Sequence, residues 1–581
     1  MAKDYSQLSK EELIKVVEKL ESRKKYGLIW DEEKVKEQFE KDAQNALPVL
    51  KETKTKEIID KDISKPRNFF IEGDNYHALS VLNFTHQEKI DVIYIDPPYN
   101  TGQKDFCYND KYIESDDEYF HSKWLSFMSK RLRLAKSLLK EDGVIFISID
   151  DNEAAQLRLL CDEVFGGENI LDTFYIQVRY AGKSLNEKDN FQKLIEQVLV
   201  YSKNKKIFSP NKPSAEYDLN KFNFEIIEKN KGTEIKLGNK KVVIFKPGDY
   251  KIIEHENGSI NLLKGTWASG SVLKGNTSGK FFHDHIEGRK SIDGINMLYK
   301  VYGIGEDGLG YRYFTGPKKE NTTKGIFYSG VPLERRKDIE EGNGSFKESP
   351  IVNFYDFSAD FGNIRHEGGV DFRSGKKPTR LLKQLINIHK NKNAIVLDFF
   401  AGSGSTGQAV LDLNNEDGGN RSFILCTNNE GNIATEICYP RIKNVIKGYK
   451  NIQGTGGFLK YFKTAFIKNS LAKDDIKIRL ANECTEMLCL RENIFGEFKK
   501  TSSYKIFKQN DKILAIYYSM ERDTLKDLKN ELSKLEGSKI LYCFTLDPLG
   551  LSKSDFVGWN DVILEPIPQK ILDVYKQIYE Y

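Results

Sequence analysis

The stretch 91-DVIYIDPPYNTG-102 places an acidic residue and an aromatic residue directly after a short apolar run. The run Val92–Ile95 is typical of a buried strand. The two prolines that follow Asp96 cannot continue this strand, because proline has no backbone N–H and fixes its own φ. The chain therefore leaves the sheet stiffly at the carboxyl end of the strand, and it holds the carboxylate of Asp96 close to the ring of Tyr99.

An acid and a ring fixed in this way suit chemistry on the exocyclic amino group of a nucleobase. Such an amine is a poor nucleophile, because its lone pair is delocalised into the ring, and hydrogen bonds accepted from its N–H groups help charge to localise on nitrogen. Asp96 and the Pro97 carbonyl can accept these hydrogen bonds. Pro98 stiffens the turn, and Tyr99 can stack on the base. A purely structural turn, stiffened by proline and capped by the aspartate, is the alternative.

The group to be transferred to such an amine can also be inferred from the chemistry. A methyl group on a sulfonium is already activated, so its transfer depends mainly on alignment and electrostatic stabilisation. A metal is not needed for this reaction.

A second candidate site is the glycine-rich stretch 397-LDFFAGSGSTG-407, which follows an expected strand and opens an expected helix. Gly402 and Gly404 let the backbone turn tightly and approach a ligand closely. The start of the helix offers free N–H groups and a positive potential, and Asp398 stands at the end of the strand. On its own, such a turn fits a nucleotide, a dinucleotide or a structural role, and its residue order differs from the dinucleotide fingerprint.

An acidic residue, Glu430, follows the next expected strand, Ser422–Thr427, where the hydroxyls of a bound ribose would fall. The neighbouring Asn428 and Asn429 could share that role. The stretch 275-GNTSGK-280 resembles a phosphate-binding loop, but it has three residues between its glycines where that loop needs four. We therefore expect no ATPase site here.

Length and composition describe the kind of chain that carries these residues. The 581 residues are too many for one core, and 39% hydrophobic and 30% charged residues are typical of a globular protein. No apolar run is long enough to span a bilayer, and the N-terminus lacks the apolar core of a signal peptide. The seven cysteines are scattered, with no C-x-x-C pair, so we expect a reducing cytoplasmic location.

The order of patterns along the chain predicts five segments. Residues 69–170 and 371–455 alternate strands with amphipathic helices, which indicates a mostly parallel sheet covered on both faces. Residues 171–370 interrupt this alternation with short strands and many glycine, lysine and aromatic residues, and an interruption of this length should be a domain. Residues 1–68 predict a helical extension, with a capping box at its start, and residues 456–581 predict a C-terminal α/β domain.

The two motifs together resemble a known family. The stretch 96-DPPY-99 is similar to the catalytic motif of amino-methyltransferases that act on DNA, and 398-DFFAGSG-404 is similar to the S-adenosylmethionine loop of the same superfamily. The order of these motifs is the permuted order of the β class. Further stretches resemble the modification subunits of type III restriction–modification systems: 25-KYGL-28, 30-WDEE-33, 72-EGDNYHAL-79, 124-WLSFMSKRLRLAKSLLKEDGVIFISIDDNE-153, 164-VFGGEN-169 and 456-GGFLKYFKT-464.

The resemblance implies a circularly permuted, Rossmann-like methyltransferase fold that transfers a methyl group from S-adenosylmethionine to adenine N6 in double-stranded DNA. The residues that would bind the target amine and base are Asp96, Pro97, Pro98 and Tyr99. The cofactor would be bound by Asp74 and Asn75 near its adenine, by Glu430 at its ribose, by Phe400, Gly402, Gly404 and Thr406 at its methionine end with Asp398 nearby, and by Lys377, whose Lys-Pro pair resembles the motif that closes the pocket.

The same resemblance makes the insertion, residues 171–370, a target-recognition domain. Basic residues interleaved with aromatic residues suit phosphate contacts and base stacking; here they are Arg179, Tyr180, Lys183, Trp267, Tyr311, Arg312, Tyr313, Lys318, Lys319, Arg335 and Arg336. One departure is 192-QKLIEQVLVYSKN-204, which matches loosely a motif in which the family commonly has His-Glu-Tyr before the strand.

Several alternatives and partners follow from this interpretation. Cytosine N4, or an RNA or protein amide, is the alternative target, although Asp at the start of the motif favours adenine by resemblance. A DNA-recognition scaffold without methylation is the alternative of another class. The resemblance also implies a homodimer and a separate ATP-dependent restriction subunit, because neither a helicase nor a nuclease motif is seen in this chain.

Overall fold

The computed structural model describes two compact units. We call residues Met1–Asn211 with Val352–Tyr581 the main unit, and Lys212–Ile351 the inserted unit. The described residues are 46–102, 107–108, 111–112, 117–182, 190–268, 277–342, 346–372, 376–468, 473–547 and 550–579, together with Ser9, Lys10, Leu13, Ile14 and Trp30. Most of the helix expected near the N-terminus, Lys183, and all of the matching stretches before residue 46 except Trp30 lie outside them. Among the described helices, none combines the length and apolar character needed to cross a membrane.

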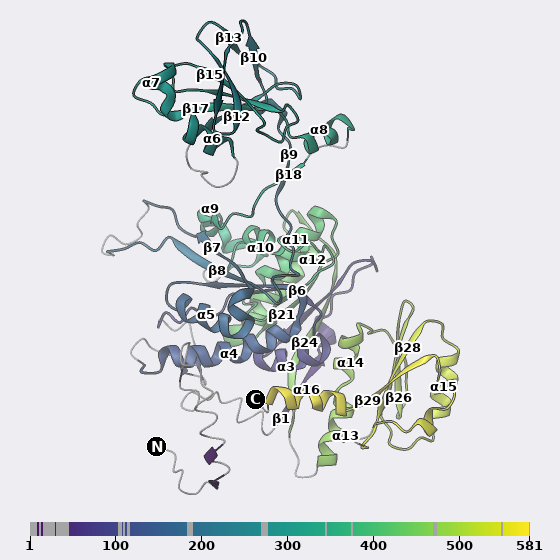
Figure 1. Cartoon of the computed structure of the whole chain (residues 1–581). Helices are drawn as coiled ribbons and strands as arrows, with labels where there is room; N and C mark the ends of the chain where they lie inside the picture. Colours follow the sequence, from purple (N-terminus) through teal and green to yellow (C-terminus); the bar gives the residue numbers. More distant parts are fainter. Residues whose placement is uncertain are drawn as a thin grey trace. The chain divides into compact units, whose positions relative to one another are not determined.

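A sheet of ten strands forms the centre of the main unit (Figure 1). Six neighbouring strands run parallel, in the order β24, β2, β21, β20, β3 and β6. Strand β8 is antiparallel to both β6 and β7, and β1 is antiparallel to β24 at the opposite edge. In sheet order the bounds are β1 Ala46–Glu52, β24 Phe458–Lys468, β2 Arg67–Glu72, β21 Ser422–Thr427, β20 Ile395–Asp398, β3 Ile90–Ile95, β6 Leu139–Ile149, β8 Ile195–Ser202, β7 Ile170–Gln177 and β19 Phe354–Asp356.

The sheet confirms the predicted α/β class and shows how its two halves join. Strands β2, β3 and β6 come before the inserted unit in the chain, whereas β20 and β21 come after it. The halves meet where β20 pairs in parallel with β3, with Val396 opposite Val92 and Leu397 opposite Ile93. The segments expected to bind base and cofactor therefore end side by side at one edge of the sheet, as the permuted order requires.

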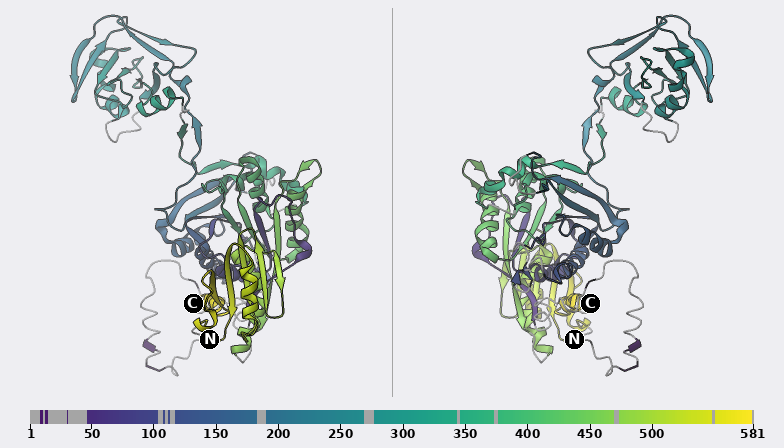
Figure 2. Two further views of the ribbon diagram at one scale, coloured as in Figure 1. Left: turned by 90° about the vertical axis from the view of Figure 1, so that its right-hand side faces the viewer. Right: turned by 90° about the vertical axis from the view of Figure 1, so that its left-hand side faces the viewer.

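Helices cover both faces of this sheet (Figures 1 and 2). One layer consists of α3 (Asn75–Thr85), α4 (Phe120–Leu138) and α5 (Ala154–Cys161), whose apolar residues share a core with alternate strand residues such as Ile93 and Ile145. The other layer consists of α10 (Thr379–Ile386), α11 (Ser405–Asp417) and α12 (Tyr439–Lys447), which bury leucine, isoleucine and valine side chains. This sandwich is what the alternating patterns predict.

The expected limits of the inserted domain, 171–370, are too wide. Strands β7, β8 and β19 lie within that range but belong to the main sheet, and the separate compact unit covers Lys212–Ile351. The apolar run Val198–Tyr201 of β8 is fully covered, because it pairs with β6 on one side and β7 on the other. This run is itself a strand signal, but the change in composition around it hides its membership of the α/β sheet.

The terminal segments also contribute to the main unit. Strands β1 and β24 join the central sheet, although they fall within the expected helical extension and the expected C-terminal domain. The C-terminal elements are α13 Lys473–Glu483, α14 Thr485–Glu492, β25 Glu497–Lys500, β26 Tyr504–Gln509, β27 Lys512–Tyr517, α15 Leu525–Ser533, β28 Ser538–Phe544, β29 Val562–Ile567 and α16 Gln569–Tyr579. Their five strands form a second sheet, whose Leu514 and Ile516 lie in the same core as Phe462 of β24.

The inserted unit is built around a six-stranded antiparallel sheet in the order β11, β12, β15, β16, β17 and β14. In chain order, the elements of this unit include β10 Phe224–Glu228, β11 Thr233–Leu237, β12 Lys240–Phe245, β13 Tyr250–Glu254, β14 Lys264–Ala268, α6 Ser278–His285, β15 Leu298–Tyr302, β16 Tyr311–Thr315, β17 Gly325–Ser329 and α8 Leu333–Glu340. Two cores, one on each face of the sheet, make this unit a domain in its own right.

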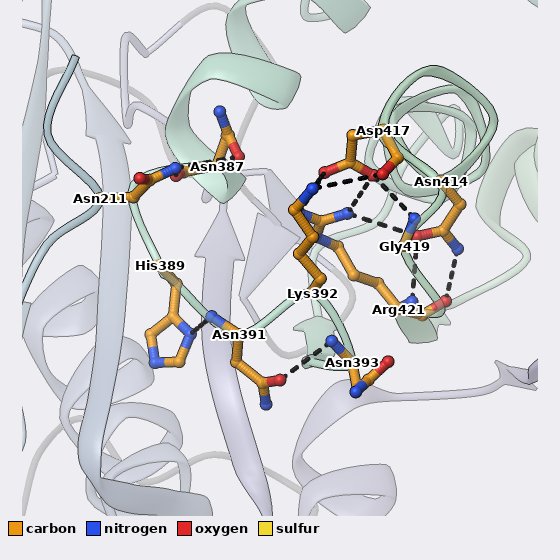
Figure 3. A network of polar contacts seen from close by, with 10 residues as sticks. All are labelled: Asn211, Asn387, His389, Asn391, Lys392, Asn393, Asn414, Asp417, Gly419 and Arg421. Carbon is orange, nitrogen blue, oxygen red and sulfur yellow. Dashed lines mark hydrogen bonds and ion pairs between the residues drawn. The ribbon is translucent and has the colours of Figure 1, made fainter. Parts of the chain in front are cut away.

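Polar contacts fix the part of the main sheet that follows the inserted unit, at the end away from the candidate site (Figure 3). The buried Arg421 donates two hydrogen bonds to Asp417 at the end of α11, and its backbone N–H donates to Asn414 Oδ1 at 3.0 Å. Asp91, buried at the start of β3, accepts from Asn391 Nδ2 at 2.9 Å and from the Ile395 N–H at 2.8 Å. These contacts help to fix the register of β20 against β3.

Candidate active site

Parallel strands bring the predicted site residues to one edge of the main sheet. Because β2, β21, β20 and β3 run parallel, their carboxyl ends meet at this edge, where open α/β sheets bind ligands. Asp398 is the last residue of β20, and Asp74, Asp96 and Glu430 lie shortly after the ends of β2, β3 and β21. Strand β8 runs the opposite way, with Gln197 opposite Ile149 at the end of β6, so Glu196 enters the same edge from its amino end.

Contacts on both sides fix the turn that contains Asp96, Pro97, Pro98 and Tyr99. Trp124 of α4, which is fully buried, donates from Nε1 to the Pro98 carbonyl at 2.7 Å. The next residue, Asn100, has φ of +56° and donates to the buried Glu153. The turn is therefore held by α4 as well as by its prolines.

Four side chains meet around this turn. Lys377 Nζ donates to Glu196 Oε2 and to the Tyr99 hydroxyl, each at 2.6 Å, and the Tyr99 hydroxyl donates to Glu196 Oε2 at 3.0 Å. Lys377 Nζ also lies 3.3 Å from Asp96 Oδ1, as an ion pair without the alignment of a hydrogen bond. Asp96 Oδ1 is buried and accepts no hydrogen bond from any described residue. The site thus places a buried carboxylate oxygen, paired with Lys377 but without an aligned hydrogen-bond donor among the described residues, beside an aromatic ring.

The charges in this cluster shift one another's protonation. Burial raises the pKa of Asp96, and the nearby Lys377 opposes that rise. Burial would lower the pKa of Lys377, but Asp96 and Glu196 together raise it to about 12. Burial also raises the pKa of Tyr99 well above its ordinary value. Lys377 is therefore a cation and Tyr99 a neutral phenol near neutral pH.

The glycine-rich loop leads from β20 into α11. Gly402 and Gly404 have φ of +49° and +79°, in the left-handed region that favours glycine. A Cβ on Gly402 would have Phe400 O, at 3.8 Å, as its nearest neighbour, whereas a Cβ on Gly404 would lie 2.8 Å from Cys438 Sγ. Of these two glycines, Gly402 therefore faces open space where a ligand could approach, while Gly404 packs against Cys438, the residue before α12.

The buried Arg441 also holds the glycine-rich loop in place. Arg441 of α12 donates to Ser405 Oγ at 2.7 Å and to Ser403 Oγ at 3.2 Å. It also donates to Glu367 Oε2 at 3.2 Å, and Glu367 accepts from the Thr379 N–H at the start of α10. One side chain thus links the glycine-rich loop to the helix that follows Lys377.

Asp398 and Thr406 hold the loop rather than project from it. Asp398 accepts from the Phe400 N–H at 3.0 Å through Oδ1 and from the Thr406 hydroxyl through Oδ2. Burial raises the pKa of Asp398 to about 7, although the hydrogen bonds from Thr406 and Phe400 act against the rise. The Thr406 hydroxyl is buried with it, so this hydroxyl is used within the loop.

Asp74 and Asn75 connect the start of α3 to the same loop. Asp74 caps α3 by accepting from the Tyr76 N–H at 2.8 Å, and Asn75 Nδ2 donates to the Phe399 carbonyl at 2.9 Å. The buried Arg131 of α4 donates to the side chains of both residues. Its guanidinium stacks on the Phe127 ring, whose centre lies 5.8 Å from that of Phe400. The predicted adenine and methionine subsites are therefore joined by one chain of contacts.

Glu430 is exposed at the start of a short 3-10 helix, Glu430–Asn432, after β21. Asn429 Oδ1 accepts from the Thr435 N–H and hydroxyl, each at 3.1 Å, so it holds the following turn. Asn428 is exposed beside it. Asn429 is thus engaged with Thr435, whereas Asn428 is exposed. Asn428 is therefore the better placed of the two asparagines to share the ribose role expected for Glu430.

Sequence reasoning missed the contacts that Glu196, Arg131 and Arg441 make. Glu196 lies in 192-QKLIEQVLVYSKN-204, so the loose motif match was a signal that could have found it. The two arginines carry no such signal, because a buried arginine is indistinguishable from a surface one in the sequence. Among the described residues, no group of three or more His, Cys, Asp or Glu side chains could hold a metal ion.

Comparison with known proteins identifies the class to which this fold and site belong. Residues 90–437 match the N6/N4 methyltransferase model, described as DNA methylase, and the chain belongs to this family. The chain is 32% identical over 402 residues to the type III restriction-modification enzyme EcoPI Mod subunit of Escherichia phage P1, over 63% of this chain and 58% of that one. It is 31% identical to the StyLTI Mod subunit of Salmonella typhimurium, over 62% of this chain and 52% of that one.

Two further proteins are also similar to this chain. The type II methyltransferase M.KpnI of Klebsiella pneumoniae is 29% identical, over 63% of this chain and 82% of that one. Among solved structures, the cytosine-N4-specific PvuII DNA methyltransferase aligns with 12% identity and a TM-score of 0.32, over 66% of this chain and 91% of that one. The chain thus spans little more than half the length of the first two relatives.

Proposed function

We propose that this protein transfers a methyl group from S-adenosylmethionine to N6 of adenine in double-stranded DNA. The observation that carries the proposal is the Asp96 carboxylate beside the Tyr99 ring, whose Oδ1 pairs with Lys377 but has no aligned hydrogen-bond donor among the described residues, at the edge where the glycine-rich loop begins. An N6 amino group can supply the missing hydrogen bond, and the ring can stack on the base. S-adenosylmethionine would bring the activated methyl group.

Each part of the site has a role in this proposal. Asp96 accepts a hydrogen bond from the target amine, and the Pro97 carbonyl accepts a second. Gly402 lets the backbone approach the cofactor, and Phe400 lines its methionine end. Asp74 and Asn75 serve the adenine, and Glu430 serves the ribose. Gly404, Asp398 and Thr406 keep the loop in shape, which refines the roles expected for them.

The adenine must leave the duplex to reach this edge. Flipping a base out costs roughly a few kcal/mol, and stacking on an aromatic ring is worth roughly 1–3 kcal/mol. Tyr99 can therefore offset much of the cost while it aligns N6 with the methyl group.

We further propose that the protein is the modification and recognition subunit of a type III restriction–modification system. Similarity to the EcoPI and StyLTI Mod subunits supports this role. A homodimer, a separate ATP-dependent restriction subunit and a location with the DNA in the cytoplasm belong to the same proposal.

The inserted unit is the proposed DNA reader. Trp267 on β14 is 64% exposed, and an exposed ring can stack on a base. Other residues that the sequence offered for this role are used within the unit: Tyr313 is buried, and Arg336 donates to the Ile260 carbonyl at 3.1 Å.

The experiment that tests the proposal uses purified protein, S-adenosylmethionine with a labelled methyl group, and DNA of varied sequence. We expect label in N6-methyladenine within one recurring sequence. Label in N4-methylcytosine would move the target to the alternative base, and DNA binding without label in any base would leave the scaffold role.

A further inference from the structure

Lys377 lies between two carboxylates at the candidate active site. Its ammonium is 2.6 Å from Glu196 Oε2 and 3.3 Å from Asp96 Oδ1, and only 9% of its side chain is exposed. A single buried cation thus serves both Asp96, from the end of β3, and Glu196, from the start of β8.

Lys377 does not divide its hydrogen bonds equally between the two carboxylates. An ammonium has three N–H donors. Two of them go to Glu196 and to the Tyr99 hydroxyl. Asp96 Oδ1 lies 3.3 Å from the ammonium, farther away than Glu196 Oε2 and without the alignment of a hydrogen bond.

Glu196 and Tyr99 hold the ammonium together. Glu196 accepts from Lys377 and also from the Tyr99 hydroxyl, which itself accepts from Lys377. The three groups form a closed ring of hydrogen bonds that holds the ammonium on the Glu196 side. Without Glu196, the strongest partner left to the ammonium would be Asp96, since hydrogen bonds between ions are stronger than neutral ones.

We propose that Glu196 is a positioning residue for methyl transfer, which holds the Lys377 ammonium nearer to itself than to Asp96, so that Lys377 balances the charge of Asp96 without an aligned hydrogen bond to Oδ1, the oxygen that would accept from the target amine. This inference rests on the proposed function and deepens it. It assigns a role to a residue outside the Asp-Pro-Pro-Tyr motif and the glycine-rich loop. It also gives Lys377 a task at the amine in addition to the expected closure of the cofactor pocket.

The proposal predicts pH effects of opposite sign for the two partners. The ionised form of Asp96 accepts the amine hydrogen bond, so activity should rise with pH through the pKa of Asp96. Lys377 lowers that pKa and Glu196 raises it. The other titratable groups that face Asp96 are Tyr94 and Tyr99 of its own segment and Asp398 of β20, and they are common to all variants.

The test measures single-turnover methylation from about pH 5 to 9 for the wild type and two variants. Lys377→Met should move the acid limb of the profile to higher pH by about one unit or more, as expected for loss of an opposite charge within about 4–6 Å. Glu196→Gln should move the limb to lower pH. It should also lower the plateau rate on the order of 10- to 100-fold, because the ammonium then lies against Asp96 and misplacement by about 1 Å can cost about 100-fold.

Lys383→Met is the matched control. Lys383 lies on the helix that follows Lys377 and pairs with Glu416 on α11, so its loss should leave the acid limb in place. Thermal midpoints close to that of the wild type would show that the variants are folded, and Glu196→Asp, which keeps the carboxylate, should recover part of the plateau rate.

The outcomes separate this inference from the proposed function. A wild type that methylates, with both variants shifting the limb in the same direction or not at all, overturns the inference and leaves the function. A wild type that methylates no adenine overturns the proposed function. Opposite shifts support the inference.

Discussion

Alanine at the two left-handed glycines should separate cofactor binding from folding. Gly402 and Gly404 lie two residues apart in the loop that leads into α11, and both have a positive φ. They differ in what a new Cβ would meet. At Gly402 it would enter open space, and at Gly404 it would lie 2.8 Å from Cys438 Sγ.

These surroundings set the expected sizes of the effects. A non-glycine residue in the left-handed region costs roughly 1–2 kcal/mol, and this is the whole expected loss of stability for Gly402→Ala. Gly404→Ala adds the overlap with Cys438, and overpacking costs about 1–3 kcal/mol. Its total should therefore be about 2–5 kcal/mol. Gly402→Ala should instead weaken cofactor binding, about 30-fold if the lost approach is worth about 2 kcal/mol.

The assay combines thermal unfolding of each variant with calorimetric titration of S-adenosylmethionine. Gly404→Ala should have the lower midpoint, and Cys438→Ala in the same chain should restore part of it by removing the sulfur. Gly402→Ala should lower the midpoint less than Gly404→Ala does, and it should bind the cofactor more weakly. Wild-type affinity in a folded Gly402→Ala protein would refute the close approach, and no rescue by Cys438→Ala would refute the packing argument.

Three further predictions concern Asp96, Tyr99 and Asp398. Asp96→Ala should abolish methyl transfer, measured with labelled cofactor, while cofactor and DNA affinities stay near the wild type; a wild-type rate would remove Asp96 from the chemistry. Tyr99→Ala should lose base stacking, seen as a changed 2-aminopurine signal at the target position, whereas Tyr99→Phe keeps the ring and loses the hydroxyl contacts to Lys377 and Glu196, so it should retain more activity than Tyr99→Ala; equal rates for both would exclude the ring as a platform. Burial raises the pKa of Asp398 to about 7, so the folded state binds more protons than the unfolded state between about pH 4 and pH 7. The thermal midpoint of the wild type should therefore rise relative to that of Asp398→Asn as the pH falls from 8 to 6. Midpoints of the two proteins that change in parallel over this range would contradict the raised pKa of Asp398.

The central sheet and its two motifs could be predicted from local patterns. Apolar runs that end in Asp96 and Asp398, separated by amphipathic helices, are short-range signals, and parallel pairing then places both ends at one edge. The chemistry proposed for Asp-Pro-Pro-Tyr also rests on residue types alone. These parts needed no knowledge of distant contacts.

The support around the site could not be predicted in the same way. Arg441 lies 36 residues from Ser405 and meets it only because α12 packs behind α11. Glu196 meets Tyr99 across 97 residues, because β8 turns back along β6. The limits of the inserted unit failed for a related reason: a strand that completes a sheet from within an irregular stretch is recognised by its partners rather than by its composition.

The most direct test of the account is single-molecule sequencing of methylated bases in DNA from cells that lack other methyltransferases and express either this protein or its Asp96→Ala variant. The account predicts N6-methyladenine at one recurring sequence with the wild type and none with the variant. N4-methylcytosine, or equal methylation by the two proteins, would contradict it.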